Sequence, residues 1–500
     1  MRKYLVHYSQ AHDSFRLPEL TSIAELHGFG HTMKVTLPDD LPDGSRGSST
    51  LEDSKPRTPR PFVIVELESE DQARVLAQRC ILIKAVYELW AHAPSYSLLH
   101  ERNQTPESRA LWEPFKSTPF RMHVTAIHHA FPEGRVRQVI QSFAYMDYEH
   151  ISLDNPGVVL FACEEYELRI GMRNKSEGDG EFMQVYFGRL VTEGTARQLI
   201  TKFDVKKRAY YGNTSMEAEM SLLMANQAQA GPGKLIYDPF AGTGSMLYTS
   251  AFFGALVFGS DIDGRQMRGK VVSASDTSSL GIIRSASQYG VAHRILDCAT
   301  FDITFNPWRR GGIFDAIVTD PPYGVRAGAK RIGSSIVGKP LSDVPRVVDN
   351  GIAAHTKSTY VPPMRPYEMS DLTLDLIEFA RYMLKPGGRL VFFLPTVTED
   401  YSELDVPECG GMKVVGNSIQ DFGKWARRLI TIERTMADNL EAQAPKFEDR
   451  AWRKREERAG REPTESNIHS DGKEEEHVPA HRDFREKYFQ GFKKEESDVS

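Results

Sequence analysis

The chain has 500 residues, a formal net charge of −6 and four cysteines. The length allows about two to four domains with separate cores, and the charge excludes a uniformly basic protein, so any contact with nucleic acid must come from local patches. The cysteines are too scattered for a disulfide framework or a Cys-x-x-Cys metal site, and we expect no metal. Because the N-terminus lacks a signal-peptide core and the longest apolar stretch, 246–258, is too short to cross a bilayer, we expect a cytoplasmic protein without membrane contact.

The N-terminal part of the chain shows a mixed α+β pattern. Segments 3–8 and 62–67 alternate like strands, and 71–80 has the periodicity of a helix. The stretch 43–60 is polar and rich in Pro and Ser, which is typical of a disordered insertion. We therefore expect a small domain over residues 1–95.

A second α+β domain is expected over residues 96–202. Its predicted strands and helices lie at 120–126, 158–163, 182–187, 135–143 and 195–202. Residues 203–232 then form a linker with a bridging helix. Basic residues precede two tyrosines in this linker, a combination that can hold phosphate and stack a base. We expect RNA contacts from Lys206, Lys207 and Arg208.

Strands alternate with helices between residues 233 and 436, which predicts a doubly wound parallel sheet. A glycine turn with Gly242 and Gly244 follows the first strand, but the third position of a dinucleotide-binding motif is Leu247. Asp238, at the start of the turn, disfavours a pyrophosphate and suits a cation. The amino or sulfonium group of S-adenosylmethionine is such a cation, and the glycines would let the backbone approach it closely.

Further acids follow the next two predicted strands. Asp261 and Asp263 come after the strand 255–258, where a carboxylate could accept both ribose hydroxyls. Asp297 is expected at the end of a third strand, where it could accept from an adenine amino group. Open parallel sheets bind ligands at the carboxyl ends of their strands, so the order of these acids favours one nucleoside site. An ordinary turn or capping role is the alternative for each acid.

The sequence Asp320-Pro321-Pro322-Tyr323 ends the apolar run 317–319. A carboxylate and a carbonyl can accept hydrogen bonds from a planar amine, and an aromatic ring can stack on it. The unit therefore predicts methylation of an exocyclic or amide nitrogen. Four residues alone could also be a coincidental tight turn after a strand.

The chain after residue 323 is rich in Gly, Ser, Pro and charge up to about residue 369. A structureless loop of this length is uncommon unless it is a lid or a binding loop. We expect its basic residues Arg326, Lys330 and Arg331 to take part in RNA capture.

Two stretches near the C-terminus complete the organisation. The cluster at 425–428 combines arginine with tryptophan and could also contact RNA. Residues 437–500 are highly charged and poor in large apolar side chains, which predicts a disordered tail. An aromatic island at 484–489 within this tail could dock on the folded part of the protein.

Several of these stretches together resemble one enzyme family. They are 187–228, which contains Lys206-Lys207-Arg208, then Asp238-Pro-Phe240-Ala-Gly242-Thr-Gly244, Gly259-Ser-Asp261-Ile-Asp263 and Asp320-Pro-Pro-Tyr323-Gly-Val-Arg326. This set is similar to the eukaryotic tRNA guanine-10 N2-methyltransferase catalytic subunits, which are THUMP-containing enzymes. The resemblance covers roughly residues 1–435, with Asn213 where the family would have proline.

The resemblance implies a fold and an activity. The fold is a ferredoxin-like domain at 1–95, a THUMP RNA-binding domain at 96–202 and a Rossmann-like class I methyltransferase domain at 233–436. The activity is transfer of one methyl group from S-adenosylmethionine to the 2-amino group of guanine 10 in tRNA. Phe240 would belong to the cofactor-binding motif.

The resemblance also implies a partner, a small zinc-binding activator protein that would form a heterodimer with this chain. Its docking surface is expected around residues 301–308. Two other functions remain open at this point. One is a non-catalytic RNA-binding or scaffold protein with a methyltransferase fold, and the other is methylation of a different planar amine, in DNA adenine or protein glutamine. The large N-terminal extension favours structured RNA over DNA.

Overall fold

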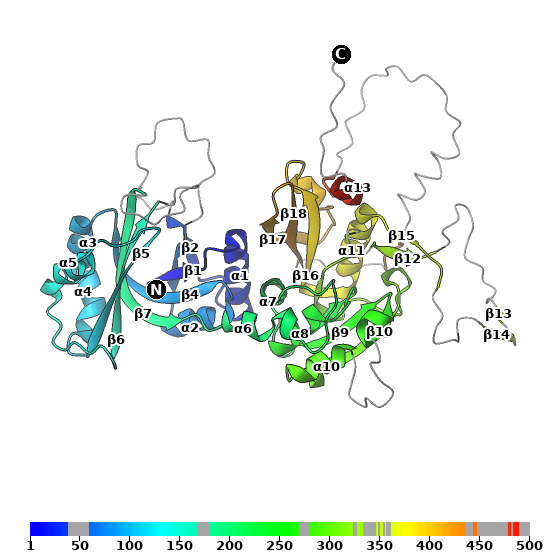
Figure 1. Ribbon diagram of the computed structural model, residues 1–500, viewed down its shortest axis with the longest axis horizontal. Helices are drawn as coiled ribbons and strands as arrows, with labels where there is room; N and C mark the ends of the chain where they lie inside the picture. The colour runs from blue at the N-terminus through cyan, green and yellow to red at the C-terminus, as the bar shows by residue number, and fades with distance from the viewer. Residues whose placement is uncertain are drawn as a thin grey trace, which may run out of the picture. The chain divides into compact units, whose positions relative to one another are not determined.

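The computed structural model describes residues 1–38, 60–167, 180–269, 281–323, 328–333, 347–348, 351–353, 356, 362–435, 444–447, 479–481 and 484–489. The chain divides into two compact units, Met1–Leu199 and Ile200–Ser500 (Figure 1). The expected insertion at 43–60 lies outside the described residues except for Arg60, as do Arg326 and most of the expected tail. No helix in the described ranges is long and apolar enough to span a membrane.

The N-terminal unit is built on one seven-stranded sheet with the order β2-β3-β1-β4-β7-β6-β5. Its strands are β1 (Arg2–Tyr8), β2 (Lys34–Thr36), β3 (Phe62–Leu67), β4 (Ile83–Ala93), β5 (Phe120–Ile127), β6 (Val158–Tyr166) and β7 (Phe182–Glu193). Its helices are α1 (Asp13–Leu26), α2 (Glu70–Arg79), α3 (Tyr96–Asn103), α4 (Pro106–Trp112) and α5 (Arg135–Ser142). Helix α6 (Gln198–Lys202) runs across the boundary between the two units.

Strand β4 joins the two expected N-terminal domains, because it pairs antiparallel with β1 on one side and with β7 on the other. Ion pairs of the largely buried Arg189 support the pairing of β4 with β7. Arg189 on β7 donates to Glu88 on β4 at 2.7 Å, and it also contacts Glu70 of α2. A charge withdrawn from water must find such partners, so these side chains hold the two halves of the sheet together.

The C-terminal unit contains a second seven-stranded sheet, with the order β10-β9-β8-β11-β16-β18-β17. Its strands are β8 (Leu235–Asp238), β9 (Leu256–Asp261), β10 (Ile295–Thr300), β11 (Phe314–Thr319), β16 (Leu384–Val397), β17 (Met412–Asp421) and β18 (Trp425–Arg434). Strands β10, β9, β8, β11 and β16 run parallel, and β18 and β17 continue the sheet antiparallel. The doubly wound sheet predicted for residues 233–436 is confirmed.

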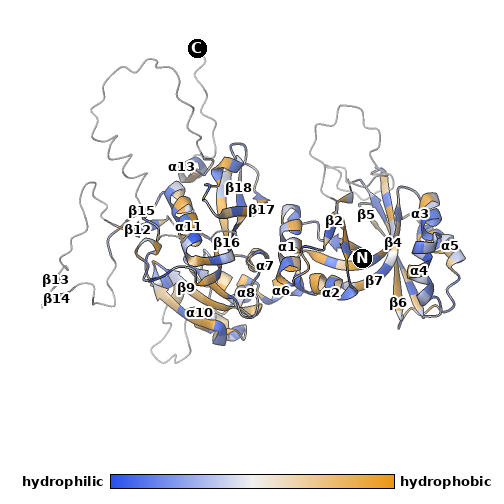
Figure 2. Cartoon of the chain, turned by 180° about the vertical axis from the view of Figure 1, so that it is seen from behind, coloured by the Kyte–Doolittle hydropathy of each residue, from blue (hydrophilic) through white to orange (hydrophobic). Residues whose placement is uncertain are grey.

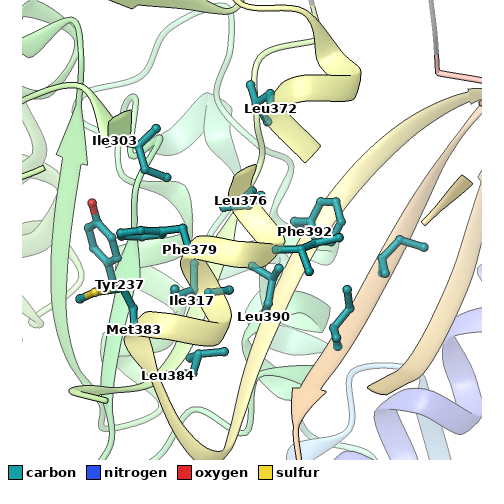
Figure 3. Close-up of a cluster of buried hydrophobic side chains, with 14 of the residues drawn as sticks. Tyr237, Ile303, Ile317, Leu372, Leu376, Phe379, Met383, Leu384, Leu390 and Phe392 are labelled. Carbon is teal, nitrogen blue, oxygen red and sulfur yellow. The ribbon is translucent and has the colours of Figure 1, made fainter. Parts of the chain in front are cut away.

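Helices cover both faces of this second sheet. They are α7 (Ala218–Gln227), α8 (Ser245–Phe252), α9 (Gly264–Arg268), α10 (Gly281–Gln288) and α11 (Met369–Met383). Figure 3 shows Phe379 and Leu376 of α11 packed against Tyr237, Leu390 and Phe392 of the strands. The strands inside each unit carry many hydrophobic residues, which are orange in Figure 2. Their burial provides the main stabilisation of such layers.

Helix α7 packs against the opposite face of the sheet from α11. Successive strand residues point to opposite faces, and on β18 Ile430 and Ile432 belong to the core beside α11. Between them, the Thr431 hydroxyl donates to the Gln227 side chain of α7 at 2.6 Å. Arg427 has the same parity as Thr431, so it faces the α7 side of the sheet.

Short segments complete the described part of this unit. Strands β12 (Lys330–Ile332) and β15 (Met364–Pro366) pair antiparallel, as do β13 (Val347–Val348) and β14 (Ile352–Ala353). Helix α13 (Phe484–Phe489) packs against Trp425 at the start of β18, through the rings of Phe484 and Tyr488. The aromatic island expected in the tail therefore docks on the sheet.

Candidate methyl-donor and amine site

Three acids lie at one edge of the second sheet. Asp238 and Asp261 end β8 and β9, and Asp320 follows the last residue of β11. Since β8 pairs in parallel with both β9 and β11, the carboxyl ends of these strands meet at the same edge. Ligands of open parallel sheets bind there, so the structure brings these three predicted residues together.

The turn after β8 is held by the carboxyl group of Asp238. Its Oδ1 accepts from the backbone N–H of Phe240 at 3.0 Å and from the Thr319 hydroxyl at 2.7 Å. Gly244 has a φ of +87°, a left-handed conformation that favours glycine. A Cβ atom there would also lie 2.9 Å from the ring of Tyr248. The sequence therefore needs glycine at this position for both backbone conformation and space.

Asp261 faces this turn. Its Oδ2 accepts from the backbone N–H of Gly242 at 2.9 Å, and its Oδ1 accepts from that of Asp263 at 2.8 Å. Asp263 instead caps α9 and forms a two-pronged ion pair with Arg265. Asp261 thus lies on the glycine turn, while both carboxylate oxygens of Asp263 bind a neighbouring side chain.

The expectation that Asp297 ends the third strand is wrong. Asp297 is the third residue of β10, it is exposed, and its carboxylate accepts from the backbone N–H of Cys298. The strand continues to Thr300, which is the residue opposite Asp261. The acid that follows the strand is Asp302, which is buried and accepts from the backbone N–H of Ile332 at 2.5 Å. Of the residues after Asp297 in this strand, Thr300 is β-branched and favours a strand but Ala299 does not, so the local signal for the longer strand was weak.

Burial disfavours the ionised form of the carboxyl groups of Asp238 and Asp320. It raises the pKa of Asp238 to about 7, with a further contribution from the charges of Asp261 and Asp320. Burial also raises the pKa of Asp320 to about 6, against the opposing effects of Tyr323 and Arg427. Desolvation disfavours the charged form. A cationic ligand at this edge would restore the ionised state.

The predicted amine-recognition unit is compact. The Tyr323 hydroxyl donates to Asp320 Oδ1, Pro321 is buried, and Pro322 and Tyr323 are half-buried. The positive charge of Arg427 on β18 acts on both Asp320 and Tyr323, and the negative charge of Glu217 acts on Asp320. Arg427 comes from the basic cluster in which we expected RNA contacts, but its side chain points into this site.

Residues 212–217 lie on the glycine turn, a contact that no local sequence pattern indicated. The hydroxyls of Ser215 and Thr243 are 2.7 Å apart, and the backbone N–H of Met216 donates to Ser245 Oγ at 3.1 Å. The next residue, Glu217, forms an ion pair with Arg427. This segment therefore contacts both the glycine turn and the amine-recognition unit.

Two of the predicted RNA-binding residues are buried, and those predictions are wrong. Arg208 donates to Ser245 Oγ at 2.8 Å and lies over the Tyr248 ring. Arg331 donates to the Phe447 carbonyl at 3.1 Å and lies over the Tyr367 ring. Both guanidinium groups serve internal packing, because aromatic faces and internal acceptors attract them. Lys206, Lys207 and Lys330 are exposed, as RNA contacts require.

The residues at this edge suit S-adenosylmethionine. Acids at the ends of β8 and β9 match a ligand with cationic and hydroxyl groups, and the open glycine turn lets the backbone approach it. Within the described ranges, no group of three or more His, Cys, Asp or Glu side chains is arranged to hold a metal ion.

Comparisons with known proteins extend this description. Residues 50–196 match the Tmrp11 THUMP N-terminal domain family, and residues 206–362 match the RMKL-like methyltransferase domain family. The chain is 35% identical to the tRNA (guanine(10)-N(2))-methyltransferase of Schizosaccharomyces pombe, over 98% of this chain and 96% of that protein.

Two further relatives carry the same name. The protein of Saccharomyces cerevisiae is 35% identical over 86% of this chain and 92% of its own length, and the Homo sapiens protein is 32% identical over 99% and 96%. These matches cover both compact units. The chain therefore belongs to the tRNA (guanine(10)-N(2))-methyltransferase family.

Proposed function

We propose that this chain is the catalytic subunit that transfers a methyl group from S-adenosylmethionine to the 2-amino group of guanine 10 in tRNA. The observation that carries the proposal is the pairing of β8 with β11. It sets the glycine turn for the methyl donor beside Asp320-Pro321-Pro322-Tyr323, which can hold an amine. The names of the relatives supply the tRNA and the guanine position.

Residues of the glycine turn and its surroundings would hold the methyl donor. When bound, S-adenosylmethionine supplies an electrophilic methyl group on its sulfonium. Asp238 offers negative charge to its amino group, and Asp261 offers acceptors to its ribose hydroxyls. We assign the adenine side to Asp302, which follows β10, instead of Asp297.

The amine-recognition unit would prepare the guanine nitrogen. Its lone pair is delocalised into the ring, so the amino group is a poor nucleophile. Asp320 and the carbonyl of Pro321 can accept its two N–H bonds, which favours a tetrahedral nitrogen with the lone pair aimed at the methyl group. The carboxylate also stabilises the positive charge that grows on this nitrogen towards the transition state. Once the methyl group has moved from sulfur to nitrogen, the nitrogen loses one N–H proton, which the Asp320 carboxylate can accept.

Binding energy remote from the site is needed as well. Exposing a paired base costs a few kcal/mol, and stacking on Tyr323 returns only about 1–3 kcal/mol of it. The N-terminal unit, which contains the THUMP match, and the exposed Lys206 and Lys207 are the sources we propose for the remainder.

Mapping the product tests this function. The purified enzyme, with its activator, is given tRNA from a strain that lacks the modification, and the methylated nucleoside is identified by mass spectrometry. We expect N2-methylguanosine at position 10. Transfer to DNA adenine or to a protein glutamine would support the alternative amine, and an absence of both transfer and S-adenosylmethionine binding would support a non-catalytic scaffold.

We also propose that the activator docks at the β10 edge of the sheet. β10 is an edge strand, and edge strands present unpaired backbone groups that another chain can cover. Exposed apolar side chains accompany it, with Leu296 54% and Phe305 57% exposed. Phe301 and Trp308 from the same expected region pack against the core instead.

Substitution at the two edges of the sheet tests this docking. Leu296→Asp and Phe305→Asp should prevent co-purification of the zinc-binding activator, because a buried carboxylate at an apolar interface is unfavourable. Val414→Asp is the matched control, since Val414 is 45% exposed on β17 at the opposite edge. If only the Val414 variant loses the activator, the activator docks at the β17 edge and our proposal is wrong.

A further inference from the structure

The Arg427 side chain is held by several groups in the C-terminal unit. It is only 13% exposed, it forms an ion pair with Glu217, and its Nε donates to the Gln420 side chain at 2.5 Å. Its guanidinium also lies 4.6 Å from the centre of the Phe393 ring. A cation so far removed from water is fixed in orientation by its partners.

Arg427 lies between two acids that belong to different parts of the site. Glu217 precedes α7 and is two residues after Ser215, whose hydroxyl contacts the glycine turn. On the other side are Asp320 and Tyr323, both of which interact with the charge of Arg427. The strand pairing agrees with this placement, because Arg427 lies over the ring of Phe393 on β16, and the neighbouring Phe392 pairs with Thr319, which precedes Asp320. The guanidinium therefore connects the segment over the methyl-donor turn with the amine-recognition unit.

We propose that Arg427 is a positioning residue that holds Tyr323 and the Asp320 carboxylate in place and offsets the negative charge of that carboxylate, and that Glu217 sets how strongly it does so. The inference rests on the proposed role of Asp320 as the acceptor for the guanine amino group. Arg427 touches neither substrate nor methyl donor in this account. It acts through the residues that do.

The charges around Asp320 give this proposal a signature that a merely structural role lacks. Arg427 favours the ionised carboxylate, Glu217 disfavours it, and Tyr323 donates to it. Asp238, from β8, is the other acid that interacts with Asp320. An opposite charge within a few Å lowers the pKa of a carboxyl group, and a like charge raises it. Removal of Arg427 and removal of Glu217 should therefore change the pKa of Asp320 in opposite directions.

The test is the pH dependence of kcat/KM for tRNA, measured with the complete enzyme at saturating S-adenosylmethionine. Saturation keeps the cationic methyl donor bound beside Asp238, so Asp238 stays ionised. The low-pH side of the profile, its acid limb, then reports the ionisation of Asp320. In Arg427→Gln we expect this limb to move to higher pH by about one unit or more. In Glu217→Gln we expect it to move to lower pH, and Arg427→Lys should restore part of the wild-type profile because the charge is kept.

Lys385→Gln is the matched control. Lys385 on β16 pairs with Asp315 on β11 at 2.9 Å, at the end of the sheet away from the site. Its loss should leave the acid limb unchanged. Calorimetric binding of S-adenosylmethionine and the melting temperature check that each variant is folded. If Arg427→Gln does not fold, the pH profiles of Arg427→Lys and Glu217→Gln test the proposal instead.

Two failures can be told apart. If Asp320→Ala keeps its turnover, the proposed function of Asp320 is wrong. If Asp320 is required but the acid limb of the folded Arg427 and Glu217 variants stays at the wild-type pH, only the positioning role of Arg427 is overturned. Shifts of the same sign in both variants would overturn it too, because the two charges are opposite.

Discussion

The carboxyl group of Asp238 lies in the interior near two other acids, Asp261 and Asp320, and the residue is only 1% exposed. An unpaired buried charge is costly, and such a group gives up its proton reluctantly. The hydrogen bonds from Phe240 and Thr319 need only an acceptor oxygen, which a neutral group can also supply. The negative charge of Asp238 is thus not needed to hold the turn, and we assign it to binding of the cationic methyl donor.

Asp238→Asn separates these two roles. The folded-state pKa of Asp238 is raised from 3.8 to about 7, so the ionised carboxylate opposes folding above pH 7. This cost decreases as the pH falls from about 7 to about 4, where the folded and the unfolded group are both protonated. We expect the variant to melt at a higher temperature than the wild type at pH 8, with a difference that vanishes near pH 4. Its binding of S-adenosylmethionine, measured by calorimetry, should be strongly weakened.

A lower melting temperature for Asp238→Asn at pH 8 would mean that the charge itself holds the turn. Undiminished binding of the methyl donor would remove Asp238 from the cofactor site.

Tyr323 offers a ring and a hydroxyl that can be removed separately. Tyr323→Ala loses the stacking surface, worth about 1–3 kcal/mol, so kcat/KM for tRNA should fall roughly 5- to 150-fold. Tyr323→Phe keeps the ring and loses only the hydrogen bond to Asp320, so most of the activity should remain. Steady-state kinetics compares the two variants, and equal losses would show that the hydroxyl is the important group.

At the scale of elements, helix α13 is the clearest element that sequence composition did not predict. Phe484 is buried against Trp425, and the backbone N–H of Ala480 donates to Asp405 at 3.0 Å. Composition predicted disorder for this tail, because its few aromatic residues are outnumbered by charges. The short aromatic island was the only signal of docking, and composition cannot show which surface receives it.

Truncation of Phe484 tests whether this docking stabilises the protein. Phe484→Ala should lower the free energy of unfolding by about 3 kcal/mol, since it removes a large buried side chain. Phe489→Ala in the same helix is the control, because Phe489 is 65% exposed. Denaturant titration measures both, and equal stabilities would indicate that the segment does not dock in solution.

Local patterns predicted individual elements well and their limits less well. The strand expected at 62–67 is β3, and the helix expected at 71–80 is α2, one residue earlier in the chain. By contrast, β10 runs past Asp297 to Thr300, where it pairs with Asp261 of β9, and this shifted the acid expected at its end. Arg208 precedes two tyrosines and Arg331 lies in a basic loop. Both were misassigned because these sequence patterns are the same whether the arginine contacts RNA or packs inside.

At the scale of the whole molecule, the pairing of strands far apart in the chain could not be predicted from the sequence. Two domains were expected before residue 202, but β4 and β7 join that region into one sheet. The paired residues are far apart in the chain, and no local periodicity reports such a contact. The ordered acids of the second sheet were predictable because each follows its own strand and parallel strands bring their carboxyl ends together.

The net charge of −6 confines any RNA contact to local basic patches. Lys206→Ala and Lys207→Ala should weaken tRNA binding, and each should reduce the slope of log affinity against log salt concentration by about one. Lys413→Ala, an exposed lysine on β17, is the control. Filter binding at several salt concentrations measures the slopes, and slopes equal to the wild type would exclude these lysines from phosphate contact.

The central claim is that the Asp320 carboxylate prepares the guanine amino group for methylation. Single-turnover methyl transfer to tRNA by Asp320→Ala, with the proposed activator present and tRNA affinity measured in parallel, tests it most directly. We predict a loss of at least about 100-fold in the rate, as for removal of other groups that stabilise transition-state charge, with tRNA affinity close to that of the wild type. A rate equal to the wild type would contradict the account.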